Sequence, residues 1–287
     1  MTSSLVSILT PSYNQARWLG DNLRSVANQS YSNIEHIVVD GGSTDGSLEM
    51  LRNAGAAVRW RSEPDRGQSH ALNKAFAAST GEIIGWLNSD DAYFDADAVA
   101  AAVRTFAKHP EVDVVYGHAA LVNADGLILQ LIWVPPFSYR LLRGYNFIIQ
   151  PAAFVRRSVL TGVFADEAFD YAMDRELWLR LGKDCQVKRL KRIVAIDRHQ
   201  LARKSLTRPD LAEADGKRLV QMYGVPPAGQ HRWRRKAIKV CFRLVGVSLL
   251  RAACRPVVFR GGVDSSLRLA WRQMAVNRAA MPVEGGP

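Results

Sequence analysis

Apolar and polar positions alternate along the chain with two different periods. Short apolar runs that end in Gly, Pro, Asp or Ser are typical of buried strands, whereas apolar residues three and four positions apart are typical of amphipathic helices. In the first part of the chain these patterns predict strands at residues 5–9, 34–39, 58–61, 82–87 and 112–116, and helices at residues 18–26, 45–51, 71–78 and 97–108. Such alternation predicts an α/β fold with a mostly parallel central sheet that is covered by helices on both faces.

The alternation weakens after residue 118. Residues 119–133 are typical of a hairpin that turns at Asn123–Gly126, because this turn sequence lies between two apolar runs. Further along, the pattern predicts a strand at residues 150–155, a helix at 173–181 and a strand at 187–196, where apolar residues alternate with Lys and Arg as in a half-exposed strand. We therefore expect one α/β domain over residues 1–215.

The charge of the chain is concentrated at one end. The 287 residues hold 38 Lys and Arg against 27 Asp and Glu, a formal net charge of +11. The net charge is −5 over residues 1–185, +4 over 186–215 and +12 over 216–287. With 48% apolar residues the chain can bury a full core, which excludes intrinsic disorder and fibrous repeats. Residues 216–287 are expected to form a basic, helical C-terminal extension.

The cysteines and the distribution of apolar residues indicate the cellular compartment of the protein. Cys185, Cys241 and Cys254 are odd in number, far apart and in no metal-type spacing, which argues against a disulfide framework and for a reducing compartment. The N-terminus lacks the basic and long apolar regions of a secretion signal, and no stretch approaches the roughly 18 apolar residues of a membrane-spanning helix. We expect the protein in the cytosol.

Four loops that follow predicted strands are rich in small or acidic residues. They comprise residues 10–14, 40–45, 62–68 and 88–91. Each loop alone is also explained as a turn, because Asp, Asn, Gly and Pro favour turns for backbone reasons. Ligands of such sheets bind outside the carboxyl ends of the strands, so four loops of this kind at one sheet edge indicate a ligand site.

An ordered set of motifs runs through these loops and beyond them. It comprises Thr-Pro-Ser-Tyr-Asn at 10–14, Val-Asp-Gly-Gly-Ser-Thr-Asp-Gly at 39–46, Glu-Pro-Asp-Arg-Gly-Gln at 63–68, Ala-Leu-Asn-Lys at 71–74, Gly-Glu-Ile-Ile at 81–84, Trp-Leu-Asn-Ser-Asp-Asp at 86–91, Gln-Pro at 150–151 and Met-Asp-Arg-Glu-Leu-Trp-Leu-Arg-Leu at 173–181. With this set the chain resembles the family 2 glycosyltransferases, which are inverting, sugar-nucleotide-dependent enzymes with the GT-A type fold. The resemblance covers residues 4–208.

The resemblance implies a divalent cation, which counters the negative charge of the donor's diphosphate. It implies that Asp91 binds the metal, that Asp90 lies against the ribose or phosphates, and that His199 approaches the metal or the diphosphate. Asn88 stands where the first acid of the motif often lies; it can hydrogen-bond the nucleotide sugar but adds no charge. Mg²⁺ and Mn²⁺ both accept oxygen ligands, so either metal fits.

The resemblance also implies a nucleotide site in the first three loops. Pro11 and Tyr13 are expected to contact the nucleobase, and Asp40 is expected to accept a hydrogen bond from a ring N–H, which uracil, thymine and guanine all offer. Asp65 and Arg66 are expected to contact the nucleotide and diphosphate, Arg66 by charge-assisted hydrogen bonds. A solvated surface charge is the alternative for Arg66.

Inversion at the anomeric carbon requires a base that takes the proton of the acceptor hydroxyl. The resemblance implies that Asp174 is this base. On the residues alone, an acid at this position is first of all an ordinary feature of a helix N-terminus. Glu176 is the second candidate, and Gln150 and Pro151 resemble part of the acceptor or donor-sugar wall.

Residues 231–260 contain nine Lys and Arg and no acid. On a helical wheel, Arg232, Lys236, Lys239 and Arg243 form one stripe, beside an apolar face of Trp233, Ala237, Val240, Leu244 and Val247. This pattern is typical of an interfacial helix on an anionic membrane surface; a helix packed on the domain with a solvated basic rim is the alternative. Nucleic acid ranks last as a partner, because the segment has no recognised nucleic-acid fold and few aromatic residues.

The sequence thus predicts a metal-dependent inverting glycosyltransferase on the cytosolic face of the cell membrane. It would move a sugar from a nucleotide-diphosphate sugar to a hydroxyl of a glycan or lipid-linked glycan acceptor for surface polysaccharide. One alternative is a non-catalytic module that binds nucleotide sugars or polyanions; Asn88 favours it, but it has no need of both Asp91 and Asp174. Another is a nucleotidyltransferase, which also uses paired acids and a metal but releases pyrophosphate.

Overall fold

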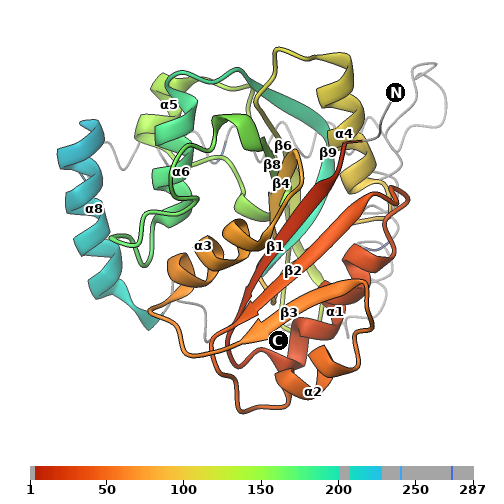
Figure 1. The fold of residues 1–287 in the computed structure, drawn as a ribbon. Helices are drawn as coiled ribbons and strands as arrows, with labels where there is room; N and C mark the ends of the chain where they lie inside the picture. Colours follow the sequence, from red (N-terminus) through yellow and green to blue (C-terminus); the bar gives the residue numbers. More distant parts are fainter. Residues whose placement is uncertain (1–3, 201–206, 228–239, 241–272, 274–287) are drawn as a thin grey trace, which may run out of the picture.

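The computed structural model describes residues 4–200, 207–227, 240 and 273. Within these residues, nine strands form one sheet in the order β3-β2-β1-β4-β8-β6-β9-β5, with β7 paired to β6 (Figure 1). The strands are β1 (Val6–Ser12), β2 (Ile34–Asp40), β3 (Val58–Ser62), β4 (Ile83–Trp86), β5 (Ala92–Tyr93), β6 (Val114–Val122), β7 (Ile128–Ile132), β8 (Ala153–Arg156) and β9 (Val187–Arg198). The helices are α1 (Ala16–Ala27), α2 (Ser47–Arg52), α3 (Gln68–Ala78), α4 (Ala98–Lys108), α5 (Tyr139–Gly144), α6 (Met173–Gly182) and α8 (Pro209–Tyr223), with 3-10 turns η1 (Gln150–Ala152) and η2 (Arg157–Val159).

Most strands of the sheet run in one direction. β1 pairs in parallel with β2 and β4, and β2 with β3. β8 is antiparallel to both β4 and β6, and β9 is parallel to β6, so β6 and β9 share the direction of the first four strands. β5, β7 and β8 run the other way. The mixed sheet confirms the predicted α/β fold class.

Helices cover both faces of the sheet, as the alternation of strands and helices predicts (Figure 1). On one face, α3, α5, α6 and α8 pack on a large core that includes Leu9, Leu72 and Leu177. On the other face, α1 and α4 pack on a second core with Ile8 and Phe106. Because neighbouring residues of a strand point to opposite faces, Ile8 and Leu9 of β1 are both fully buried.

The middle of the chain follows the predicted pattern with changes in extent. The strand predicted at residues 112–116 is the first part of the longer strand β6. The chain turns at Asn123–Gly126 after β6, and β7 then pairs with β6, so the predicted hairpin is confirmed. The strand predicted at residues 150–155 is divided into η1 and β8. η1 begins with Gln150 and has Pro151 in its first turn, and proline fits there because the first helical N–H groups have no partner within the helix.

β9 is more buried than its alternating sequence predicts. It lies between β6 and β5, and most of its residues from Arg192 to Arg198 are buried. The guanidinium of Arg192 pairs with the carboxylate of Asp95 at 2.7 Å, where both side chains are nearly inaccessible to solvent. A charged side chain can be buried when it is paired and hydrogen-bonded, so the expectation of a half-exposed strand is wrong for this half of β9.

α8 lies beyond the elements that the pattern predicts. Its Leu219, together with Val225 after its end, is buried in the large core. The expected boundary between residues 215 and 216 therefore falls inside a helix that packs on the domain. Most of the expected extension 216–287, including the basic segment 231–260, lies outside the described residues, and its separation from the domain stays a prediction.

In the part of the chain that the structure describes, no helix is long and apolar enough to cross a lipid bilayer. The longest helix among these residues, α8, has 15 residues, whereas a membrane-spanning helix needs roughly 20 apolar residues.

Two buried histidines make the stability of the fold depend on pH. Burial lowers the pKa of His36 to about 4 and that of His118 to about 3. The unfolded chain takes up these protons near the ordinary pKa of about 6.5. Below that value the unfolded state therefore binds more protons than the folded state, and stability is lost as the pH falls. We expect the two side chains together to lower the free energy of unfolding by about 4 kcal/mol between pH 7 and pH 5.

Urea unfolding at pH 7 and pH 5 measures this loss. In His118→Asn the loss should be smaller by about 2 kcal/mol, because asparagine does not titrate. The asparagine Oδ1 is bonded to Cγ, as Nδ1 of histidine is, so it can still accept the hydrogen bond that the Val134 N–H donates to His118 Nδ1 at 3.1 Å. An equal loss in this variant and in the wild type would contradict a buried, neutral His118.

Candidate functional site

A cleft of about 1040 Å³ lies at the carboxyl ends of the parallel strands. Its lining comes from the loops after β1, β2, β3 and β4, from η1, from the turn before α6 and from α8. Nine of the predicted site residues line it: Pro11, Tyr13, Asp65, Asn88, Asp90, Asp91, Gln150, Pro151 and Asp174. Asp40, Arg66 and His199 are not part of this lining. The loops that the sequence predicts to meet at one edge of the sheet do meet there.

The side-chain amide of Asn88 uses all of its hydrogen-bonding positions. Its Oδ1 accepts from Gln68 Nε2 at 2.7 Å and from Trp86 Nε1 at 2.8 Å. Its Nδ2 donates to Gln150 Oε1 at 2.9 Å and to Asp91 Oδ2 at 3.3 Å. A carboxylate at this position would lose both donated bonds and add a negative charge beside Asp91. The network therefore favours the amide over the acid that the family motif often has.

The end of β9 holds the loop that carries Asp90 and Asp91. Asp91 is 4% exposed, and its Oδ1 accepts from the backbone N–H of Arg198 at 3.0 Å. The backbone carbonyl of Asp90 accepts from Arg198 Nε at 2.9 Å, and Asp90 Oδ2 accepts from Gln200 Nε2 at 3.2 Å. The two acids expected to contact metal and phosphate are thus held by Arg198 and Gln200, which follow them in the chain by at least 107 positions.

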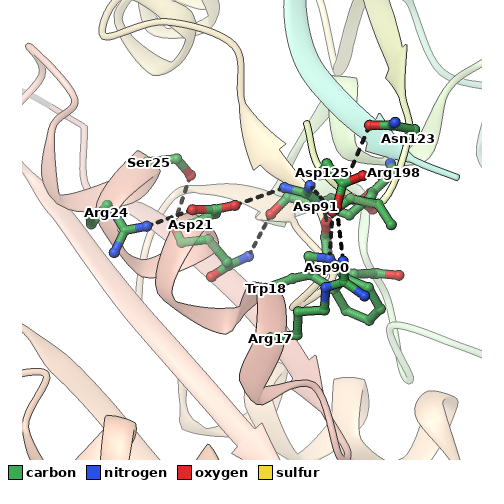
Figure 2. A network of polar contacts seen from close by, with 12 residues as sticks. Arg17, Trp18, Asp21, Arg24, Ser25, Asp90, Asp91, Asn123, Asp125 and Arg198 are labelled. Atoms are coloured by element: carbon green, nitrogen blue, oxygen red, sulfur yellow. Dashed lines mark hydrogen bonds and ion pairs between the residues drawn. The ribbon is translucent and has the colours of Figure 1, made fainter. Parts of the chain in front are cut away.

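Arg198 joins this acidic loop to two other parts of the fold (Figure 2). Its Nη2 pairs with Asp21 Oδ2 of α1 at 3.0 Å, and its Nη1 donates to the carbonyl of Ala124, in the β6–β7 turn, at 3.1 Å. The same carbonyl accepts from Trp18 Nε1 of α1 at 3.0 Å. Nothing in the sequence pattern distinguishes Arg198 from the other basic residues of β9, because its role depends on which segments surround the strand's end.

The residues at the end of β9 and just beyond it differ in whether they face the cleft. Asp197, Arg198 and Gln200 line it, whereas His199 is exposed to solvent. The structure therefore does not bring His199 to Asp91. Gln200 is the polar side chain that lies beside the acidic loop instead.

Asp40 ends β2, but its carboxylate turns into its own loop. Its Oδ2 accepts from the backbone N–H groups of Gly42 and Ser43 and from Ser62 Oγ, at distances between 2.7 and 3.0 Å. Asp40 is fully buried. In this structure it stabilises the loops after β2 and β3 and does not face the cleft.

Gly41 allows two residues of the expected nucleotide site to approach each other. A Cβ atom at this position would lie 2.7 Å from Asp65 Oδ2 and 3.3 Å from Cδ2 of Tyr13. A side chain at this position would therefore displace the Asp65 carboxylate from where it lies. Tyr13 is 61% exposed, so the cleft has an aromatic ring beside a carboxylate, a combination that suits the face and the N–H groups of a nucleobase.

Arg66 lies outside the cleft. Its Nη2 pairs with Glu167 Oε2 at 2.7 Å, and its side chain is 69% exposed. This is the position of a surface charge, which is the alternative that the sequence leaves open for this residue.

Asp174 is the second residue of α6 and lines the cleft. Its Oδ2 accepts from Asn146 Nδ2 at 3.0 Å, a contact that no sequence signal indicates. Glu176, the second candidate for the base, is 1% exposed and bonds with Arg180 Nε at 3.0 Å and with the Tyr223 hydroxyl at 2.6 Å. Of these two carboxylates, Asp174 is the one that lines the cleft.

The acids of the cleft fit one mode of metal binding. Among the residues that the structure describes, no group of three or more His, Cys, Asp or Glu side chains is placed to hold a metal ion. Mg²⁺ commonly binds through one or two carboxylates and completes its shell with water and substrate phosphates. Asp91, with Asp90 beside it, offers this kind of partial oxygen site.

Comparisons with known proteins bear on this cleft. The model of the family described as "Glycosyl transferase family 2" matches residues 7–165, more than half of the chain. An uncharacterised glycosyltransferase of Mycobacterium tuberculosis is 33% identical over 193 residues, which are 65% of this chain and 72% of that protein. The chondroitin synthase of Pasteurella multocida is 32% identical over 195 residues, which are 66% of this chain and 20% of that longer protein.

A solved structure has the same architecture. It is a mannosyltransferase of Pyrobaculum calidifontis in complex with GDP-Man and Mn²⁺. The TM-score is 0.54 with 21% sequence identity, and the match covers 99% of this chain and 77% of that one. At this identity the likeness shows the fold alone, and it confirms the expected GT-A type fold.

The network around Asn88 predicts how the cleft responds to metal. Asn88→Asp replaces the donor to Asp91 Oδ2 by a second carboxylate. The two carboxylates repel each other when no cation is present, and a bound divalent cation offsets this repulsion. We expect Asn88→Asp to melt about 3 °C or more below the wild type without metal and to show a larger rise in melting temperature with Mn²⁺.

Differential scanning fluorimetry measures both effects. Asn53→Asp makes the same chemical change at an exposed residue outside the cleft and serves as the matched control. A Mn²⁺ response of Asn88→Asp equal to that of the wild type would show that the two side chains do not share a cation site.

Proposed function

Because the chain belongs to family 2 of the glycosyl transferases, we propose that it transfers a sugar, with inversion, from a nucleoside-diphosphate sugar to a hydroxyl group of a glycan or lipid-linked glycan. The observation that carries this proposal is that Asp91 and Asp174, the expected metal ligand and the expected base, line one cleft. A module that only binds nucleotide sugars would not need both carboxylates.

The donor would lie along the loops that follow β1, β3 and β4. The exposed ring of Tyr13 would contact the nucleobase, and Asp65 would lie near it, since both side chains approach Gly41. The complex of the mannosyltransferase with GDP-Man and Mn²⁺ supports a sugar nucleotide and a divalent cation in this fold. When bound at Asp91, Mn²⁺ or Mg²⁺ would supply positive charge to the departing diphosphate.

Asp174 would act as the base of the reaction. It would accept the proton of the acceptor hydroxyl while the hydroxyl oxygen forms a bond to the anomeric carbon. The bond between that carbon and the diphosphate oxygen breaks on the opposite face, and the nucleoside diphosphate leaves with the electron pair. Asn146, which donates to Asp174 Oδ2, would orient the carboxylate for this proton transfer.

The comparison with a polysaccharide synthase bears on the acceptor and on where the reaction takes place. The relationship to chondroitin synthase favours a role in polysaccharide synthesis, and the matched residues span a fifth of that protein. We therefore propose that the acceptor is a growing or lipid-linked glycan for the cell surface and that transfer takes place on the cytosolic side of the membrane.

Product analysis with purified protein tests the proposed reaction. With Mn²⁺ and a panel of UDP, GDP and dTDP sugars, the wild type should release a nucleoside diphosphate. Asp91→Asn and Asp174→Asn should each lower the rate by about 100-fold or more, through loss of the metal ligand and of the base. Glu49→Gln removes an exposed acid of α2 outside the cleft and should leave the rate unchanged.

The same assay separates the alternatives. Equal, slow release by the wild type and Asp91→Asn would favour a binding module without catalysis. Release of pyrophosphate in place of a nucleoside diphosphate would favour a nucleotidyltransferase.

We further propose that the basic segment 231–260 brings the enzyme to an anionic membrane surface, on the support of its sequence alone. The full chain should sediment with vesicles of phosphatidylserine and phosphatidylcholine, and salt should weaken this binding, because each basic residue near the surface contributes about 1 kcal/mol. A variant with glutamine at Arg232, Lys236, Lys239 and Arg243 should bind at least tenfold more weakly. Vesicle binding that neither salt nor these substitutions reduce would remove this part of the proposal.

A further inference from the structure

The carboxylate of Asp215 in α8 holds the turn that precedes α6, the helix that carries Asp174. Asp215 is 1% exposed, although it lies in a helix on the outside of the sheet. Its Oδ2 accepts from three consecutive backbone N–H groups, those of Asp170 at 3.1 Å, Tyr171 at 2.8 Å and Ala172 at 2.9 Å. These three residues also line the cleft.

These three N–H groups lie before the hydrogen-bonded part of α6. The helix begins at Met173, and its first backbone hydrogen bond runs from the N–H of Glu176 to the carbonyl of Ala172, so the N–H groups of residues 170–172 are outside the helical pattern. A buried N–H group without a partner costs stability, and a carboxylate is a stronger acceptor than a neutral group. Asp215 supplies the acceptor from a helix that is 43 residues away in the sequence.

The position of Asp174 depends on this turn. Asp174 follows Ala172 by two residues, so any movement of the turn moves the start of α6 and the carboxylate with it. Asn146 orients the side chain of Asp174 through a 3.0 Å hydrogen bond to Oδ2. Asp215 acts at a different place, because it holds the backbone of the turn that comes directly before Asp174.

We propose that Asp215 is a positioning residue for the base Asp174. The proposal rests on the proposed function, in which Asp174 takes the proton of the acceptor hydroxyl. It makes α8 a part of the catalytic unit, and it assigns a role to an acid that no motif of the sequence marks. Placement within a fraction of an ångström matters for proton transfer, and a displacement of about 1 Å can lower a rate by about 100-fold.

The structure provides a matched control on the same pair of helices. α8 also contacts α6 through the Tyr223 hydroxyl, which donates to Glu176 Oε1 at 2.6 Å. This contact lies outside the cleft lining, so Tyr223→Phe weakens the attachment of α8 without removing an acceptor from the turn. A purely structural role of Asp215 predicts the same kinetic effect for both variants, whereas a positioning role predicts a difference.

Steady-state kinetics of the full chain with Mn²⁺ and its donor sugar tests the proposal, at a temperature below the melting transition of every variant. Asp215→Asn should lower kcat by about tenfold or more with little change in the KM for the donor, because Asp215 bonds to the turn before Asp174 and not to the described residues expected to hold the nucleotide. Binding of the nucleoside diphosphate with Mn²⁺, measured by calorimetry, should stay within twofold of the wild type. Tyr223→Phe should keep the kcat of the wild type.

The outcomes separate this proposal from the proposed function. If Asp174→Asn retains the activity of the wild type, Asp174 is not the base and the proposed mechanism fails. If Asp174→Asn is inactive while Asp215→Asn keeps the kcat of the wild type, only the positioning role is overturned. Equal losses of kcat in Asp215→Asn and Tyr223→Phe would also overturn it. If Asp215→Asn does not fold, Asp215→Glu keeps the charge but displaces the carboxylate, and the same loss of kcat is expected.

Discussion

The order of the cleft depends on one buried guanidinium. Arg198 ends β9, and its side chain donates to Asp21 of α1, to the carbonyl of Asp90 and to the carbonyl of Ala124 in the β6–β7 turn. A guanidinium carries five N–H donors in fixed directions, so a single side chain can join three distant segments, which a flexible ammonium group cannot do with the same geometry. The backbone N–H of the same residue holds Asp91. The acidic loop is therefore positioned by the fold itself, which is the pre-organisation that electrostatic stabilisation requires.

The carboxylates around the cleft fall into two groups. Asp40 and Asp215 are buried, and each accepts from three or more groups of the protein, so they hold loops and turns in place. Asp174 and Asp91, of which Asp91 is also largely buried, line the cleft, where a substrate can contact them. This division affects the electrostatics of the cleft. The carboxylates of Asp40 and Asp215 are compensated by hydrogen bonds from backbone N–H groups, whereas those of Asp91 and Asp174 contribute negative charge to the cleft.

The parts of the fold with local signals could be predicted from the sequence. The central strands are apolar runs because both faces of the sheet are covered. Parallel strands end at the same edge of a sheet, so the sequence also predicts that the loops after them meet there. Asp215 and Arg198 could not be predicted, because their partners are up to 177 residues away and become neighbours only in the fold. His199 and Gln200 show that a sequence pattern does not distinguish two neighbouring residues of a site, because one step along an extended chain decides which side chain faces the cleft.

A crystal structure of the chain with a nucleoside diphosphate and Mn²⁺ tests most directly that this cleft is a glycosyltransfer site. We expect the metal to contact Asp91 and the diphosphate, and the nucleobase to lie against Tyr13. The terminal phosphate should point toward Asp174, with room between them for the sugar and the acceptor hydroxyl. A nucleotide bound away from Tyr13, with a metal that does not touch Asp91, would contradict it.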